Sequence, residues 1–135
     1  MLPDFAFVLT VEGTVSASEE PGKVREAAAN VILGSSYDAR EDGSSVILRT
    51  QDPRALSKLH DQFRDRRVRG AARRLLLRGT EGESTTLMIN RQAAAAGVIV
   101  LCSSEIESPL GPLVLKIQSK QLDPIVKWLT DYVEG

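Results

Sequence analysis

Histidine and cysteine are nearly absent from this chain of 135 residues, which has one of each. A single cysteine cannot form an internal disulfide, and Cys102 follows the aliphatic run Val98 to Leu101, a setting typical of a small buried side chain. His60 lies in a predicted helix, where a boundary histidine is more typical than a general base. These two residues form no tetrahedral metal site without carboxylates, and no glycine-rich phosphate loop occurs. We therefore predict no metal, no cofactor and no enzymatic activity.

Aromatic residues and long hydrophobic runs are also scarce. Three Phe, two Tyr and one Trp make up 4% of the chain, so the core must be aliphatic, and few rings are available to stack on unpaired bases. The longest apolar run, Ala93 to Cys102, is too short to span a bilayer, and no targeting segment is visible. We expect a cytoplasmic protein that does not contact a membrane.

The composition is otherwise that of a folded domain. The chain is 42% hydrophobic and 26% charged, and its length is sufficient for one core. Alternating hydrophobic residues predict the first strand, and the turn residues Glu41 to Gly43 predict a hairpin. Aliphatic runs predict three later strands. The predicted strands are Phe5–Val15, Tyr37–Arg40, Val46–Thr50, Ser84–Asn90, Val98–Cys102 and Leu113–Ile117.

Helices are predicted between the strands from capping residues and hydrophobic spacing. Pro21 follows two acids and begins a helix that ends near Gly34, and Asp52-Pro53 begins a second. An arginine-rich helix follows, either separately or as the continuation of one long kinked helix. A helical turn is predicted at Arg91–Ala96, and a last helix after Asp123-Pro124 should bury Ile125, Trp128, Leu129 and Tyr132.

This order of elements predicts an α+β fold. Strands in hairpin-like groups with helices between them are typical of a largely antiparallel sheet whose helices pack on one face. No repeat or linker divides the chain, so we expect a single domain over residues 1–135.

Positive charge is concentrated in one segment. Between Arg64 and Arg78 the chain has seven arginines and one acid, Asp65, a local balance of +6, whereas the rest has ten basic and seventeen acidic residues. On a helix, the apolar side chains of this segment fall within one arc and most arginines lie on its two flanks. Guanidinium groups pair with phosphate oxygens in a bidentate fork and release counterions. Nucleic acid is the first hypothesis.

A solvated helix face is the alternative interpretation of this segment. Arginines on such a face pair with acids elsewhere in the fold, but pairing at helical spacing needs interleaved acids, and only Asp65 is available within the segment. The arginines must therefore find distant carboxylates or a ligand.

A second polar group stands at Asn90-Arg91-Gln92, where a strand passes into the predicted helical turn. Asn90 can cap the turn while Arg91 and Gln92 present hydrogen-bond donors, which would suit contact with a phosphate. The alternative is a plain N-cap at Asn90 and a solvated Gln92. The loop Pro109-Leu-Gly-Pro112 is either a rigid turn or a ligand loop.

Three motifs of the sequence carry a resemblance to a known family: Ala71-Ala72-Arg73, Asn90-Arg-Gln-Ala-Ala-Ala-Ala-Gly97 and Ser108-Pro-Leu-Gly-Pro112. The chain resembles, over nearly its whole length, a small archaeal family described as RNA-binding and predicted to be exosome-associated. The resemblance implies a fold similar to that of a 5S-RNA-binding protein of the large ribosomal subunit, and contact with RNA. Gly70 stands where the family pattern has an acidic residue, and Arg91 where it has lysine.

The sequence thus leads to two functional hypotheses. The first is a noncatalytic protein that binds structured RNA through backbone and shape, in RNA processing or translation and in an RNA-processing complex. The second is an assembly module whose basic helix binds an acidic partner or a second copy in a homodimer. The residues expected to contact nucleic acid are Arg64, Arg66, Arg67, Arg69, Arg73, Arg74, Arg78, Asn90, Arg91 and Gln92.

Overall fold

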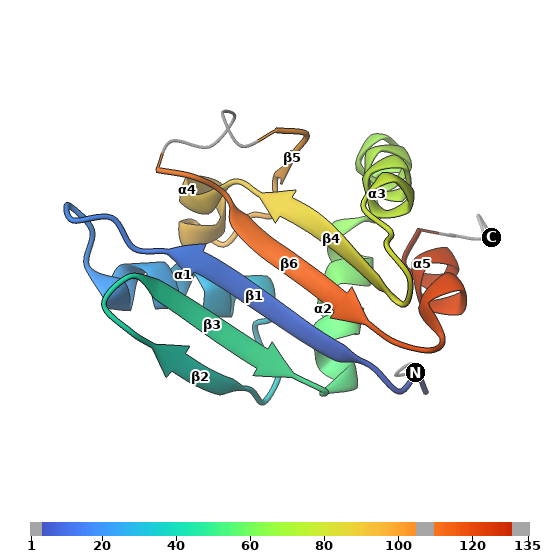
Figure 1. Ribbon diagram of the computed structural model, residues 1–135. Helices are drawn as coiled ribbons and strands as arrows, with labels where there is room; N and C mark the ends of the chain where they lie inside the picture. Colours follow the sequence, from blue (N-terminus) through green and yellow to red (C-terminus); the bar gives the residue numbers. More distant parts are fainter. Residues whose placement is uncertain (1–3, 105–109, 131–135) are drawn as a thin grey trace.

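The computed structural model describes residues 4–104 and 110–130. These residues form one antiparallel sheet of six strands in the order β2-β3-β1-β6-β4-β5, together with five helices (Figure 1). The strands are β1 (Val8–Thr14), β2 (Asp38–Glu41), β3 (Ser45–Thr50), β4 (Ser84–Ile89), β5 (Leu101–Cys102) and β6 (Leu113–Gln118). The helices are α1 (Pro21–Val31), α2 (Pro53–Gln62), α3 (Arg66–Arg78), α4 (Arg91–Ala95) and α5 (Leu122–Thr130).

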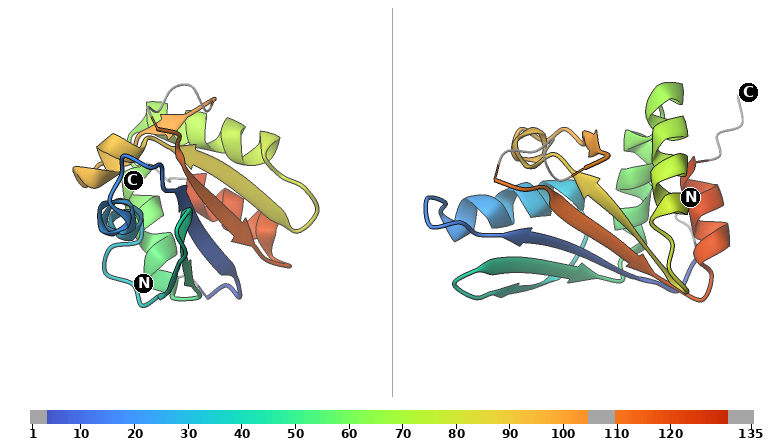
Figure 2. Two further views of the ribbon diagram at one scale, coloured as in Figure 1. Left: turned by 60° about the vertical axis from the view of Figure 1, so that its left-hand side comes forward. Right: turned by 45° about the horizontal axis from the view of Figure 1, so that its top comes forward.

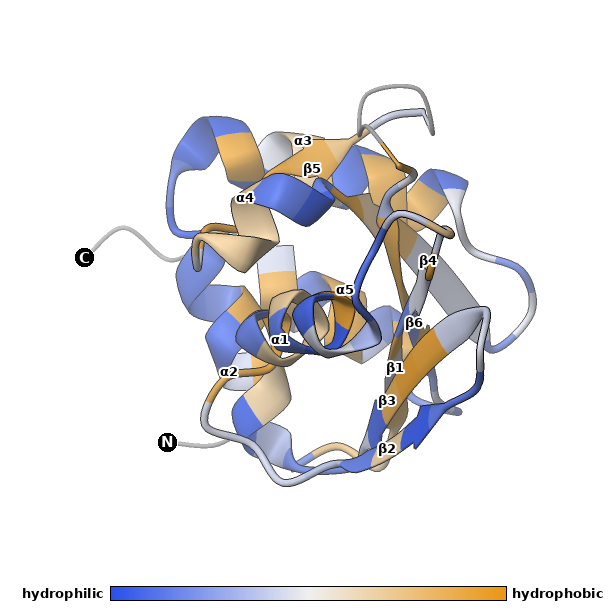
Figure 3. Cartoon of the chain, turned by 90° about the vertical axis from the view of Figure 1, so that its left-hand side faces the viewer, coloured by the Kyte–Doolittle hydropathy of each residue, from blue (hydrophilic) through white to orange (hydrophobic). Residues whose placement is uncertain are grey.

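The helices lie on one side of the sheet, as the sequence predicts. Figure 3 shows the sheet nearly edge on, with α1 and α2 on one side and no helix of the described residues across the other. The helix α3 stands beyond β4 and packs beside α5 (Figures 1 and 2). One face of the sheet is therefore open.

Alternation along the strands divides the sheet into a buried and an open face. In β1, Leu9 and Val11 are fully buried while Glu12 is exposed, and β6 repeats this pattern with Leu115 buried and Lys116 exposed. Successive side chains of a strand point to opposite faces, so the aliphatic set packs under the helices and the polar set faces outward. The largest fully buried side chains are Phe63, Leu9, Ile32, Leu48, Leu56, Leu59, Leu76, Ile89, Leu113, Leu115, Ile117 and Ile125.

The arginine-rich segment forms a helix separate from α2. Phe63, at the end of α2, is fully buried, and the chain leaves the helix there before Asp65 caps the start of α3. Of the two alternatives, two helices rather than one kinked helix are observed. Tyr132 and Pro109 lie outside the described residues.

One predicted strand is much shorter than expected. Of Val98–Cys102, only Leu101 and Cys102 pair with β4. The preceding residues instead complete the end of α4, because the Val98 N–H donates to the Ala93 carbonyl at 2.9 Å and Gly97 adopts a positive φ of 85°. The prediction of a five-residue buried strand is therefore wrong.

Candidate nucleic-acid interface

The basic helix α3 is fixed to the fold by its start, its apolar side and its end. Asp65 accepts a hydrogen bond from the Arg67 N–H at 2.8 Å and so caps the first turn. Ala72 and Leu76 are fully buried against the core. At the end of the helix, a Cβ on Gly79 would lie 2.6 Å from the Thr86 carbonyl oxygen, so only glycine fits there without a shift.

Most arginines of this helix are exposed, and they differ in their partners. Arg64, just before α3, forms an exposed ion pair with Asp61 at 3.4 Å. Arg66 and Arg69 each make an interaction within the chain. Across residues 4–104 and 110–130, the other four form no ion pair with a carboxylate. These four, called here the unpaired arginines, are Arg67, Arg73, Arg74 and Arg78, and all are exposed.

Two of the unpaired arginines line a groove between α3 and the sheet. One hollow of about 320 Å³ includes Arg78, Thr86 and Val114, and an adjoining hollow of about 490 Å³ includes Arg74. Leu75 and Ser103 line both hollows. The groove thus has guanidinium groups on its helix wall and hydroxyl and aliphatic groups on its sheet wall.

Arg91 does not belong to this surface. Only 4% of the residue is exposed. Its Nη1 donates to both carboxylate oxygens of Glu19 at 2.9 Å and to the Thr14 carbonyl at 2.6 Å, and its Nε donates to the Gly111 carbonyl at 3.1 Å. The expectation that Arg91 presents its donors to a ligand is therefore wrong, because the guanidinium is occupied inside the fold.

The environment of Glu19 matches this role of Arg91. Burial by itself raises the pKa of the Glu19 carboxyl, but the hydrogen bond from the Ser16 N–H, the hydrogen bond from Arg91 and the charge of Arg91 together outweigh it. The pKa of Glu19 is therefore held below its ordinary value, and the carboxylate is charged beside the guanidinium.

Asn90 and Gln92 have different environments in the structure. The Asn90 side chain is half-buried, and its Oδ1 accepts a hydrogen bond from the Ala93 N–H at 2.9 Å, which caps α4. This contact favours the N-cap interpretation. Gln92 is exposed and is the one side chain of the three with free access to solvent.

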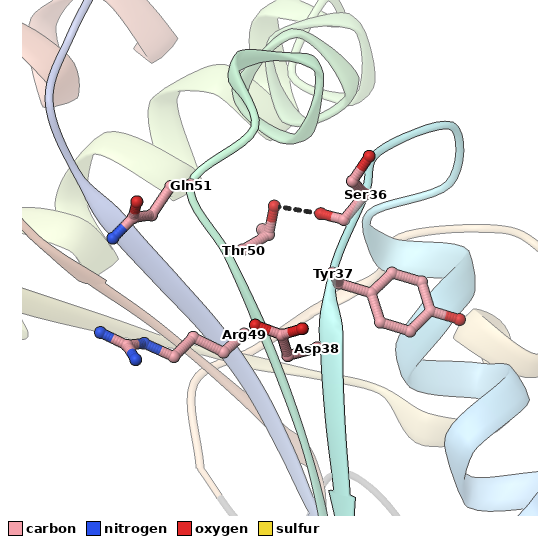
Figure 4. A pocket seen from close by; sticks show the side chains of 6 residues that line it. All are labelled: Ser36, Tyr37, Asp38, Arg49, Thr50 and Gln51. Carbon is pink, nitrogen blue, oxygen red and sulfur yellow. Dashed lines mark hydrogen bonds between the residues drawn. The ribbon is translucent and has the colours of Figure 1, made fainter.

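The open sheet face carries cations that were not among the predicted site residues. Arg49 on β3 and Lys116 on β6 are exposed, and neither forms an ion pair within the described residues. Arg49 borders three hollows on the sheet, of about 280, 660 and 440 Å³. In Figure 4 its side chain points from β3 toward β1, away from Tyr37. Both cations stand at the polar positions of alternating strands, the signal that would have identified them.

Curated relatives of the chain are archaeal. It is 37% identical over 122 residues to a UPF0201 protein of Metallosphaera sedula, a match that covers 90% of this chain and 85% of the relative. A UPF0201 protein of Pyrococcus abyssi is 35% identical over 121 residues and is covered to 86% of its length. The chain belongs to the UPF0201 family. No protein-family model matches the sequence.

Solved structures of UPF0201 proteins share this fold. The UPF0201 protein of Methanococcus jannaschii superposes with a TM-score of 0.75 at 21% identity, over 95% of this chain and 96% of its own. A DUF54 protein from Methanothermobacter thermautotrophicus gives a TM-score of 0.64 at 24% identity, over 93% and 99% of the two chains. The α+β fold predicted from the sequence is confirmed.

Two features of the described residues bear on other classes of function. None of the helices in residues 4–104 and 110–130 is long and apolar enough to cross a bilayer. The same residues hold no group of three or more His, Cys, Asp or Glu side chains arranged around a metal-sized space.

Proposed function

We propose that this UPF0201 protein is a noncatalytic RNA-binding protein that contacts RNA phosphates through α3, in RNA processing or translation. The observation that carries the proposal is the set of unpaired arginines, which meet no carboxylate within the described residues. They project from one helix of a chain whose formal net charge is −1. Such a local excess of positive charge attracts a polyanion, and a net charge of −1 opposes this attraction only weakly.

The geometry of α3 favours recognition of the RNA backbone rather than of unpaired bases. The unpaired arginines supply bidentate donors for phosphate oxygens. The groove beside the helix contains Arg74, Arg78 and aliphatic side chains but no aromatic ring, so stacking has little part in the proposal. Association with an RNA-processing complex, a cytoplasmic location and likeness to a 5S-RNA-binding ribosomal protein stay predictions from the family resemblance.

A salt titration with a charge-reversal variant tests the proposal. We expect wild-type protein to bind a structured RNA hairpin with an affinity that falls steeply as salt rises, because each phosphate contact releases counterions. The variant Arg73→Glu with Arg74→Glu should bind at least about tenfold more weakly. Replacing the same two residues by Gln should reduce the slope of log K against log salt by about 1.4 to 1.8.

The matched control reverses two cations away from α3. Lys23 lies on α1 and Lys58 on α2, so Lys23→Glu with Lys58→Glu changes the net charge by the same amount. Thermal unfolding establishes that each variant is folded. The proposal fails if the α3 variant and the control bind the hairpin equally, or if wild-type affinity is independent of salt.

A protein-interaction module is the second candidate, and one observation favours it. Leu77 is 57% exposed although it lies between the arginines of α3. A large exposed aliphatic side chain within a charged surface is typical of a contact with another protein. If α3 joins two copies, sedimentation should show a dimer that Leu77→Asp converts to a monomer, and the hairpin should not bind.

A further inference from the structure

A straight row of polar side chains crosses the open face of the sheet. The pairing register places Arg49 of β3 opposite Thr10 of β1, Thr10 opposite Lys116 of β6, and Lys116 opposite Thr86 of β4. Arg49, Lys116 and Thr86 are exposed and Thr10 is half-buried. We call these four residues the cross-strand row. Neighbouring strands lie about 4.8 Å apart, so the backbone positions of Arg49 and Lys116, two strands apart, are about 10 Å from each other.

The acids on this face lie outside the middle of the row. Asp38 of β2 is opposite Arg49 at the far end, yet the two form no ion pair, and Figure 4 shows the Arg49 side chain extending toward β1 instead. Glu12 belongs to the next row, opposite Ile47 and Val114. The cross-strand row therefore has two positive charges of its own, separated by a threonine.

The other end of the row reaches the groove beside α3. Thr86 lines the hollow of about 320 Å³ together with Arg78, and the close fit of Gly79 against the Thr86 backbone holds the helix end at this place. Arg74 lines the adjoining hollow. Cations and hydroxyl groups thus follow one another from α3 across the sheet, in the order Arg74, Arg78, Thr86, Lys116, Thr10 and Arg49.

We infer that the cross-strand row binds the sugar-phosphate backbone of a single RNA strand that leaves α3 and runs across the open face, perpendicular to the β-strands. This inference rests on the proposed function. Arg and Lys supply contacts to phosphates, and threonine hydroxyls donate to phosphate or sugar oxygens. The row contains no aromatic side chain, so the backbone and the 2′-hydroxyls are the groups that it can recognise.

The experiment compares two RNA probes and two variants. The probes are a blunt RNA hairpin and the same hairpin with a single-stranded 3′ extension. The row variant is Arg49→Glu with Lys116→Glu, and the α3 variant is Arg73→Glu with Arg74→Glu. We expect the row variant to bind the extended hairpin at least about tenfold more weakly than wild type does, and the blunt hairpin as tightly as wild type does. We expect the α3 variant to bind both hairpins at least about tenfold more weakly.

Neutral substitutions provide a second measurement that adds no acids to the sheet. Arg49→Gln with Lys116→Gln should reduce the salt slope for the extended hairpin by about 1.4, since each contact with a single strand contributes about 0.7. The control Lys23→Glu with Lys58→Glu should leave both probes unaffected.

The outcomes separate this inference from the proposed function. If the α3 variant loses both probes while both row variants bind the extended hairpin as wild type does, the cross-strand row is not an RNA site and the proposed function stands. If the α3 variant also binds both hairpins as wild type does, the inference and the proposed function are both wrong.

Discussion

Arg91 and the unpaired arginines of α3 show two opposite uses of the same side chain. The Arg91 guanidinium is buried and donates to the Glu19 carboxylate and to the backbone carbonyls of Thr14, Gly111 and Pro112. Arg73 and Arg74 are exposed and meet no carboxylate in residues 4–104 and 110–130. A buried charge must be matched inside the fold, whereas an exposed one is available to a ligand. The contacts of Arg91 therefore stabilise the fold, and the exposed arginines of α3 are the ones that we propose to bind a ligand.

The largest expected effect is the loss of the Arg91 guanidinium. Arg91→Ala removes the ion-pair partner of the Glu19 carboxylate and the hydrogen bonds that Arg91 donates to the Thr14 and Gly111 carbonyls. We expect the free energy of unfolding to fall by about 3–5 kcal/mol. Urea denaturation measures it. Arg73→Ala is the matched control and should change the free energy by less than about 0.5 kcal/mol. Equal effects of the two substitutions would contradict the comparison.

A smaller effect is expected when the charge at this position is kept but its shape is changed. In Arg91→Lys, one ammonium group can replace Nη1 beside Glu19 and Thr14, but it cannot also reach the Gly111 carbonyl that Nε contacts. The hydrogen bond to Gly111 and the longer one to the Pro112 carbonyl are lost, and we expect the free energy of unfolding to fall by about 1–2 kcal/mol in urea denaturation. If lysine is as stable as arginine here, the carbonyl contacts contribute nothing.

Protonation of Glu19 should weaken the same contact without removing Arg91. Because the folded-state pKa of Glu19 is below its ordinary value of 4.5, its contribution to stability is fully present above pH 4.5 and is lost as the pH falls through the folded pKa. The effect should be smaller than that of Arg91→Ala, since the backbone carbonyls keep their donors. Urea denaturation across this pH range should show a shallower dependence for Glu19→Gln. An unchanged pH profile in that variant would exclude the ion pair as its source.

The sequence predicted the sheet and helices well because their signals are local. Alternation identified β1, β3 and β6, and the apolar arc of the arginine-rich segment identified the helix α3. The burial of Arg91 and its contacts were not predictable from such local signals. Its partners at Thr14, Glu19 and Gly111 are far from it in the sequence, and the pairing of β6 with both β1 and β4 brings them together. The cross-strand row was missed for the same reason, since register is a tertiary property.

The smallest expected effect has the opposite sign and tests the exposed side of the comparison. Arginines at i, i+3 and i, i+4 on α3 repel one another, and within the described residues no carboxylate pairs with Arg73 or Arg74 to offset this. Arg73→Gln with Arg74→Gln should therefore raise the free energy of unfolding by a few tenths of a kcal/mol (about 0.2–0.5) at low salt. Screening by added salt should remove the gain. Thermal unfolding at low and high ionic strength measures the gain in stability and its loss on screening. If the variant is less stable than wild type at low salt, these two guanidinium groups stabilise the fold as Arg91 does.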